Sequence, residues 1–304
     1  MTAEPVTSQQ PAAPAEVPAT VRASLSPSRA ADFKTCPLLY RFRSIDRLPE
    51  RPTVEQVRGT LVHAVLERLF DLPADGRTPS AAGDLVAPQW DRLVTEQPEL
   101  AALFPDGDPA AAGEFLRSAA ALLEGYFAVE DPRRLEPAER ESLISAVVDD
   151  ELLIRGYLDR LDVAPDGALR VVDYKTGGAP REAFEARALF QLKFYALVLW
   201  RTRGVVPRVL RLLYLRDAEV CDYAPDADEL LRFERTVVAL WRAIEQATER
   251  QDFRPRPSRL CDWCSHQALC PSFGGTPPPF PTAVAGADPM RDARSRPAPP
   301  GADE

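Results

Sequence analysis

Two aspartates and a lysine in the second half of the chain have the types and spacing of a metal-binding group. Asp173 and Lys175 end an apolar segment that is followed by two glycines. Because side chains alternate along a strand, Asp173 and Lys175 would point to one face, about 7 Å apart. Asp159 lies upstream, and the turn sequence Asp166-Gly167 lies between the two aspartates. A hairpin at that turn would bring Asp159 near Asp173.

The chemistry that suits these three residues is metal-assisted hydrolysis. Two carboxylates so close together repel each other unless a cation lies between them, and Mg²⁺ prefers oxygen ligands. Such an ion activates a water and neutralises charge that develops on a phosphate. Lys175 could position or deprotonate that water. The alternative is that Asp173–Lys175 and Asp159–Arg160 are ordinary ion pairs at strand ends.

Three other polar residues stand at helical spacing. His63 follows Gly59 by one turn, and Gln191 and Tyr195 share one face of an otherwise apolar segment. Two of them, His63 and Tyr195, have a structural alternative as well. His63 could pair with Glu67 on the next turn, and Tyr195 could be a core residue with a satisfied hydroxyl.

Four of the five cysteines indicate a metal centre that would join the two ends of a domain. Cys36 stands alone before Pro37, whereas Cys261, Cys264 and Cys270 are close together. Zinc is the usual ion for four cysteines, and an iron–sulfur cluster also needs four thiolates, commonly with a proline after the last one. His266 could also ligate a metal, but four thiols suffice. We expect the fifth cysteine, Cys221, to be a free thiol.

The order Gly59-x3-His63, Asp159, Asp173-x-Lys175 and Gln191-x3-Tyr195 resembles the PD-(D/E)xK nuclease superfamily and, within it, the RecB-type nuclease domain. The cysteine pattern is similar to that of the iron–sulfur branch, which includes AddB-type and CRISPR-adaptation nucleases. The resemblance covers about residues 24–273. It implies an α/β fold of the restriction-endonuclease type, in which helices flank a mixed sheet. It also implies a helical insertion and a 4Fe–4S staple between the N- and C-terminal segments, with zinc as the alternative.

The resemblance also implies a role for each residue. A Mg²⁺ or Mn²⁺ ion would be held by His63, Asp159, Asp173 and the carbonyl of Tyr174. Lys175 would act on the attacking water, Gln191 would orient either Lys175 or that water, and Tyr195 would contact DNA. The acidic residue expected before Asp159 stays open, because five residues compete for it: Glu139, Glu141, Asp149, Asp150 and Glu151.

The activity implied by the resemblance is that of a metal-dependent DNA exonuclease. It would hydrolyse phosphodiester bonds in DNA repair or recombination, on single-stranded DNA or DNA with ends. The alternatives are a CRISPR-adaptation nuclease and a DNA-binding iron–sulfur protein with a vestigial nuclease site. The sequence has no Walker A motif, so any helicase would act in trans.

These residues need a scaffold, which the periodicity of the sequence predicts. Residues 1–22 and 274–304 have the composition of disordered tails, and 23–273 form one nuclease domain. Within it, 71–135 is a mainly helical insertion and 253–273 is the cysteine segment. The pattern predicts helices at 27–36, 54–70, within 84–130, and at 182–203 and 226–250. Strands are expected at 142–148, 152–163, 169–174 and 209–215.

The net charge of −9 is unevenly distributed. Residues 200–216 contain five arginines and no acid. Binding of a polyanion depends on local positive surface rather than on the total charge, so four of these arginines are candidate DNA contacts: Arg201, Arg203, Arg208 and Arg211. The alternative is a solvated face. Since no apolar run is long enough to cross a bilayer and no signal peptide is evident, we expect a cytoplasmic protein without membrane contact.

Overall fold

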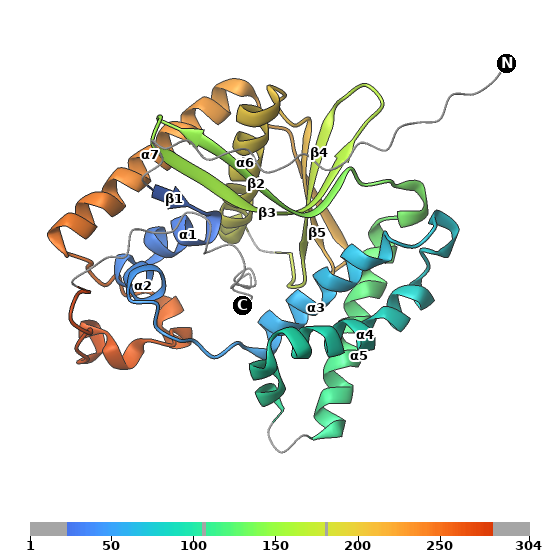
Figure 1. Cartoon of the computed structure of the whole chain (residues 1–304), viewed down its shortest axis with the longest axis horizontal. Coiled ribbons are helices and arrows are strands. Elements are labelled where there is room, and N and C mark those ends of the chain that lie inside the picture. Colours follow the sequence, from blue (N-terminus) through green and yellow to red (C-terminus); the bar gives the residue numbers. More distant parts are fainter. Residues whose placement is uncertain (1–22, 105–107, 180–181, 282–304) are drawn as a thin grey trace.

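The computed structural model describes residues 23–104, 108–179 and 182–281, without the side chains of 182–187. Its centre is a mixed sheet in which β1, β3, β4, β5 and β6 are neighbours in that order, and β2 pairs with β3 (Figure 1). The strands are β1 (Ala23–Leu25), β2 (Glu139–Val148), β3 (Leu152–Val163), β4 (Leu169–Lys175), β5 (Val209–Tyr214) and β6 (Glu219–Tyr223).

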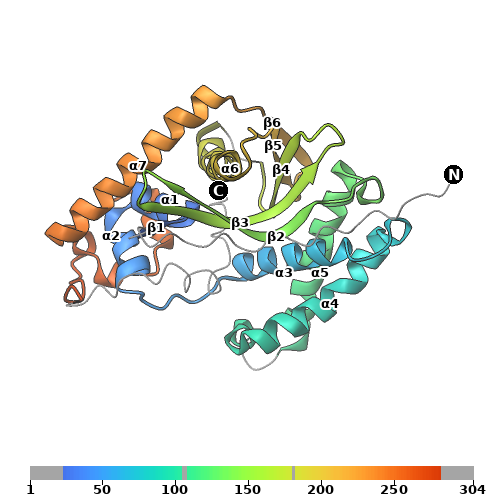
Figure 2. The ribbon, with the colours of Figure 1, turned by 45° about the horizontal axis from the view of Figure 1, so that its top comes forward.

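Helices cover both faces of this sheet (Figures 1 and 2). Alternate residues of the central strands enter two separate cores, as Val171 and Val172 of β4 do. One core holds the helices α1 (Pro27–Thr35), α2 (Pro37–Tyr40), α6 (Glu182–Arg203) and α7 (Ala227–Arg250). The other holds α3 (Val54–Leu69), α4 (Pro79–Glu96) and α5 (Pro109–Val129). The predicted α/β class, with a mixed sheet between helices, is confirmed.

Local sequence signals explain where several elements begin and turn. The Ser26 side chain accepts a hydrogen bond from the Arg29 N–H and caps α1, and Thr53 and Gln56 form a reciprocal capping box at α3. The β3–β4 connection turns at Gly167, whose φ of 81° lies in the left-handed region that favours glycine. The predicted hairpin is therefore present.

The sheet opens in the middle of β3, and this opening places the site. One edge of β3 pairs with β1 through residues 152–154 and with β4 through residues 160–163. Residues 155–159 on that edge have no partner strand within the described part of the chain. The last β3–β4 pair is Arg160 with Val172, so Asp159 and Asp173 stand where the two strands separate.

The helical insertion packs tightly on the sheet and is not a separate domain. Helices α4 and α5 pack on α3, and Gly125 of α5 lies directly on β5. A Cβ at Gly125 would lie 1.8 Å from the Leu215 carbonyl oxygen, so no side chain fits there. This close approach makes the insertion one body with the strands that carry the site.

The packed region continues past the predicted boundary at residue 273. Phe280 stacks on Phe253 with ring centroids 6.1 Å apart, and the Arg41 guanidinium lies 5.2 Å from the Phe280 ring. Residues 282–304 and 1–22, the rest of the predicted tails, lie outside the described residues. Within the described ranges, no helix combines the length and apolarity that a bilayer crossing requires.

Candidate active site

Three potential metal ligands meet at the opening between β3 and β4. His63 of α3 approaches from the side of the helical insertion, and its Nδ1 lies 3.6 Å from Asp159 Oδ2 and 3.4 Å from Glu141 Oε1. One ligand atom from each of these three residues lies within 4.8 Å of the others. The His63 Nε2 lies 3.0 Å from the Tyr174 carbonyl oxygen, which adds an oxygen donor beside the group.

Glu141 is the acidic residue that the sequence left open among five candidates. It lies on β2 across from Asp159 on β3, between the pairs Arg140–Arg160 and Ser142–Leu158. Its φ of 42° is unusual for a residue with a side chain, and such strain concentrates at functional sites. Counting back from the turn at residues 149–151 along an antiparallel pair would have singled it out.

Asp173 is buried beside the compact group but is engaged with Lys175. Lys175 Nζ lies 2.6 Å from Asp173 Oδ2 and donates a 2.9 Å hydrogen bond to Gln191 Oε1. Gln191 Nε2 in turn donates to the Tyr195 hydroxyl at 2.8 Å. The fold thus gathers the five residues that the sequence assigned to catalysis, with α6 supplying two of them: Asp159, Asp173, Lys175, Gln191 and Tyr195.

Tyr195 reaches this position because β3 has no side chain beneath its ring. A Cβ at Gly156 would lie 2.7 Å from Tyr195 Cε1. Burial raises the pKa of the Tyr195 hydroxyl, and the Asp173 and Asp159 carboxylates raise it further. The hydroxyl therefore stays protonated and can donate a hydrogen bond toward the site.

The negative charges of Asp159, Asp173 and Glu141 favour binding of a cation beside them. Burial raises the pKa of Asp159; His63 opposes this rise, whereas Asp173 and Glu141 add to it. Burial favours neutral His63, but Asp159 and Glu141 outweigh burial and raise the pKa of its imidazole. Two carboxylates, one carbonyl and one imidazole are a donor set that fits Mg²⁺ or Mn²⁺. The predicted ligands His63 and Asp159 belong to this group, and Asp173 lies next to it.

A family model of the PD-(D/E)XK nuclease superfamily matches residues 24–271. The chain belongs to this superfamily. Nucleases of the superfamily use divalent metals, which agrees with the donor set in the opening of the sheet. Membership also implies a nucleic acid substrate.

Two viral proteins and one solved structure are similar to this nuclease. The Gene 69 proteins of Mycobacterium phages D29 and L5 are 26% and 24% identical, and each match covers 82% of this chain and 96% of the phage protein. The crystal structure of a "Putative exonuclease" from Eubacterium rectale superposes with a TM-score of 0.51. It covers 81% of this chain and 88% of its own at 11% identity, a likeness of fold alone.

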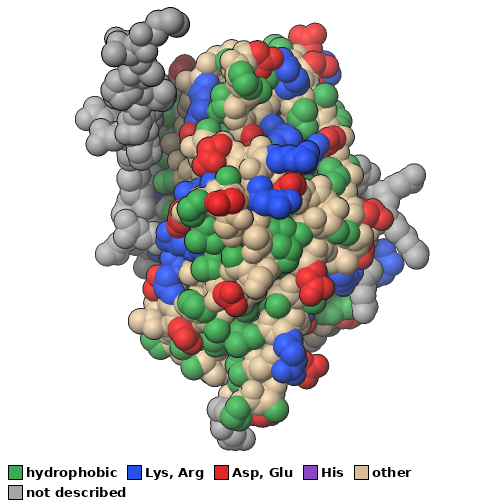
Figure 3. Space-filling model, turned by 90° about the vertical axis from the view of Figure 1, so that its right-hand side faces the viewer, with side chains coloured by type: hydrophobic (Ala, Val, Ile, Leu, Met, Phe, Trp, Pro, Cys, Tyr) green, Lys and Arg blue, Asp and Glu red, His purple; other side chains and the backbone are tan. Residues whose placement is uncertain are grey.

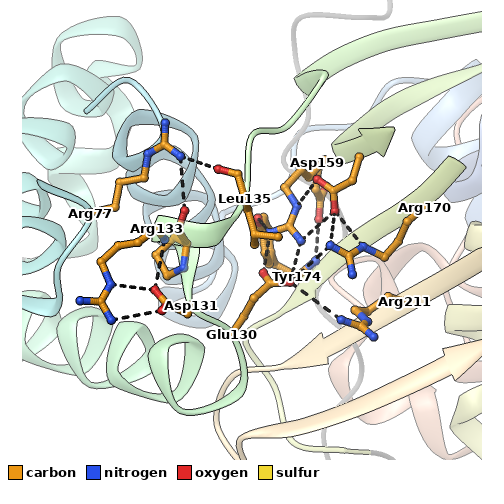
Figure 4. Close-up of polar contacts among 12 residues, drawn as sticks. Arg77, Glu130, Asp131, Arg133, Leu135, Asp159, Arg170, Tyr174 and Arg211 are labelled. Atoms are coloured by element: carbon orange, nitrogen blue, oxygen red, sulfur yellow. Dashed lines mark hydrogen bonds and ion pairs between the residues drawn. The ribbon is translucent and has the colours of Figure 1, made fainter. Parts of the chain in front are cut away.

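A buried charge network fixes β4 from the side of the insertion (Figure 4). The Arg160 side chain is fully buried and donates to both carboxylate oxygens of Glu130, at 2.6 and 2.8 Å. It also donates to the Tyr174 hydroxyl at 2.9 Å and pairs with Asp162. Meanwhile the Tyr174 N–H donates to Asp159 Oδ2 at 2.7 Å. The network therefore fixes Tyr174, whose backbone N–H binds Asp159 and whose carbonyl oxygen lies beside His63 Nε2.

The sequence suggested Arg160 only as an ion-pair partner of Asp159. The feature that could have revealed its role is its position as a charged residue inside the apolar segment of β3. A buried charge needs a partner of opposite charge. The partner, Glu130, lies at the end of α5 in the insertion, thirty positions upstream. No local pattern connects the two positions.

The described arrangement of the cysteines does not show the predicted iron–sulfur cluster. Among the described residues, no three cysteine sulfurs lie within 4.8 Å of one another, so the cysteines are not arranged as a compact metal site. None of the five cysteines, all of which lie within the described ranges, forms a disulfide. Four of them nevertheless line one pocket between the N- and C-terminal segments: Cys36, Cys261, Cys264 and Cys270. His266 is engaged with a carboxylate rather than with the thiols, because its Nε2 lies 2.7 Å from Glu50 Oε1.

The four arginines predicted to contact DNA are all engaged with carboxylates. The pairs are Arg201–Glu234, Arg203–Glu139, Arg208–Asp166 and Arg211–Asp222. On the side of the molecule shown in Figure 3, positive and negative side chains likewise lie next to each other. This pairing reduces the local positive charge that the sequence alone indicated.

Proposed function

We propose that this nuclease is a RecB-type DNA exonuclease that hydrolyses phosphodiester bonds in DNA repair or recombination. The observation that carries the proposal is the convergence of His63, Glu141 and Asp159 beside Lys175 at the opening of the sheet. The name of the similar Eubacterium rectale protein supports exonucleolytic action. DNA with single-stranded ends is the proposed substrate.

The residues divide into metal ligands and groups that handle the water. His63, Glu141, Asp159 and the Tyr174 carbonyl would hold Mg²⁺ or Mn²⁺, which supplies charge neutralisation at the phosphate and lowers the pKa of a bound water. Asp173 and Gln191 hold the Lys175 ammonium from two sides. The ammonium is therefore fixed where it can orient the attacking water and stabilise negative charge on the phosphate oxygens.

End-labelled DNA tests this assignment. We expect wild-type protein to cleave it with Mg²⁺ or Mn²⁺ and not with EDTA. Asp159→Asn and Lys175→Ala should each lower the rate by at least about 100-fold, because each removes charge needed in the transition state. Cys221→Ser is the matched control and should cleave normally. Full activity in purified Lys175→Ala would remove the assignment of this site.

We also propose that the four pocket-lining thiols bind a 4Fe–4S cluster. A four-iron cluster is larger than a zinc ion, so its thiolates stand farther apart around it. Two backbone N–H groups already point at sulfurs, from Arg256 to Cys36 Sγ at 3.4 Å and from Ser258 to Cys261 Sγ at 3.3 Å. Hydrogen bonds of this kind stabilise bound clusters.

Anaerobic purification tests the cluster proposal. We expect brown protein with about four irons per chain, and colourless, less stable protein for Cys36→Ser. Cys221→Ser should keep the colour. Zinc in place of iron would leave a metal staple but refute the cluster, and an unchanged metal content in Cys36→Ser would refute the staple.

A further inference from the structure

An apolar pair of side chains lies beside the metal-binding group on the same strands. Leu143 of β2 and Tyr157 of β3 are directly opposite each other in the antiparallel register. They are 38% and 39% exposed, although they are large and apolar. Asp159 lies two residues from Tyr157 along β3, a step of about 7 Å in an extended strand, and Glu141 lies two residues from Leu143 along β2.

Tyr157 differs from the other tyrosines of the chain in having no partner among the described residues. The other six have a hydrogen bond, a ring contact or another interaction with the protein. For Tyr157, neither the ring nor the hydroxyl has such a contact in the described ranges. An aromatic face this exposed, next to a group that binds a metal, is available to a ligand.

The size of this pair decides what kind of ligand fits it. Protein interfaces bury about 800 Å² on each partner, far more than two half-exposed side chains offer. A flat aromatic ring beside an aliphatic side chain matches the area of one nucleobase, and every base presents a face that stacks on aromatic rings. The distance to the carboxylates is about one step along a nucleic acid backbone, which links the base to the phosphate at the metal.

We infer that Leu143 and Tyr157 form a stacking platform for the nucleobase next to the phosphate that is cleaved. The inference rests on the proposed nuclease function and specifies its substrate. A base inside a duplex already stacks on its neighbours, so it must leave that stack to reach the platform. The platform therefore selects DNA whose terminal nucleotides are unpaired.

The inference is tested with two single-stranded oligonucleotides, one intact and one with abasic residues in place of the two terminal nucleotides at each end. For wild-type protein, KM should be about tenfold higher on the abasic strand, since one stacked base contributes about 1–3 kcal/mol. Tyr157→Ala should raise KM on the intact strand about tenfold at unchanged kcat, and should no longer distinguish the two strands.

Two variants control for packing and chemistry. Tyr157→Phe keeps the ring and should behave as wild type. Val163→Ala alters another exposed apolar side chain at the far end of β3, so it should leave both KM values unchanged. Leu143→Ala provides a second test of the platform, and circular dichroism confirms that each variant is folded.

The possible results separate the platform from the nuclease itself. Equal KM values of the wild type for the two strands, or an unchanged KM in Tyr157→Ala, would overturn the platform and leave the nuclease assignment standing. Wild-type protein that cleaves neither strand with Mg²⁺ or Mn²⁺ would overturn the proposed function, and the platform with it.

Discussion

At the scale of single residues, carboxylates of the site repel one another, and a bound cation would reduce that repulsion. Glu141, Asp159 and Asp173 bring three carboxylates to one place, and His63 is the imidazole among them. In the absence of metal, the pKa values of Asp159 and His63 are both raised, so the folded protein binds protons more tightly there than the unfolded chain does. Protons and metal therefore compete for the same group.

This competition predicts how stability depends on pH. A raised folded-state pKa contributes stability at low pH that is lost as the pH rises, for His63 above its ordinary value of about 6.5. We expect the Tm of EDTA-treated protein to fall from about pH 6.5 to about pH 10, the range between the ordinary and the raised pKa of His63. Adding Mn²⁺ should raise Tm by about 5 °C at pH 8 and by less at pH 6.

A pair of glutamate variants makes this prediction specific to the site. Glu141→Gln removes one of the competing carboxylates, so both the pH-dependent fall and the Mn²⁺ effect should shrink. Glu151→Gln changes an exposed glutamate of the β2–β3 turn and should behave as wild type. A Mn²⁺ effect that is equally large in Glu141→Gln would show that Glu141 does not bind the ion.

At the scale of elements, the helical insertion stabilises the two strands β3 and β4 that carry the site. Glu130 at the end of α5 neutralises Arg160 of β3, and Arg160 also holds the Tyr174 side chain of β4. Removing one partner of a buried ion pair leaves an uncompensated charge. We expect Arg160→Ala to lower the free energy of unfolding by about 3–5 kcal/mol and to lower cleavage as well, because β4 loses its anchor.

Urea unfolding of matched arginine variants checks this. Arg133 is also paired with an aspartate in the same region (Figure 4), but its side chain is 58% exposed. Exposed pairs contribute little, so Arg133→Ala should leave the free energy of unfolding nearly unchanged. Similar losses for both variants would mean that the Arg160 network does not stabilise the strands.

Much of this arrangement could be predicted from the sequence, and the exceptions share a cause. The bounds of β3 and α6 agree with those expected from periodicity, because long apolar patterns determine them. The three-residue strand β1 and the edge strand β6 were missed, since they are too short or too polar to show alternation. The Glu130–Arg160 pair and the role of Glu141 depend on contacts between distant segments, which local patterns do not contain.

At the scale of the whole molecule, the N- and C-terminal segments are joined by polar contacts independent of any metal. His266 bonds Glu50, which also pairs with Arg43, and Arg43 pairs with Asp32 of α1. Burial opposes ionisation of Glu50, but bonds to His266 and Arg43 outweigh it and lower its pKa to about 2. The charge network thus holds the C-terminal segment against the segment that carries Glu50 and against α1.

Charge placement across the molecule predicts where DNA approaches. In contrast to the ion-paired arginines between residues 201 and 211, Arg51 and Arg58 have no hydrogen bond or ion pair with any described residue. Arg58 lies on α3, five residues or about 8 Å along the axis from His63. The positive end of the α3 dipole adds to this charge. Within the described residues these two arginines have no competing carboxylate, so they are better candidates for phosphate contacts than the ion-paired arginines.

Salt titrations of DNA binding in Ca²⁺ distinguish the two groups of arginines. Each phosphate contact on single-stranded DNA contributes about −0.7 to the slope of log K against log salt. The double variant Arg51→Gln/Arg58→Gln should weaken binding and make the slope shallower by about 1.4. Arg201→Gln/Arg208→Gln removes the same charge but breaks ion pairs with Glu234 and Asp166, so its slope should change by less than half as much. The opposite ranking would place the DNA along residues 201–208, because only phosphate contacts release counterions in this way.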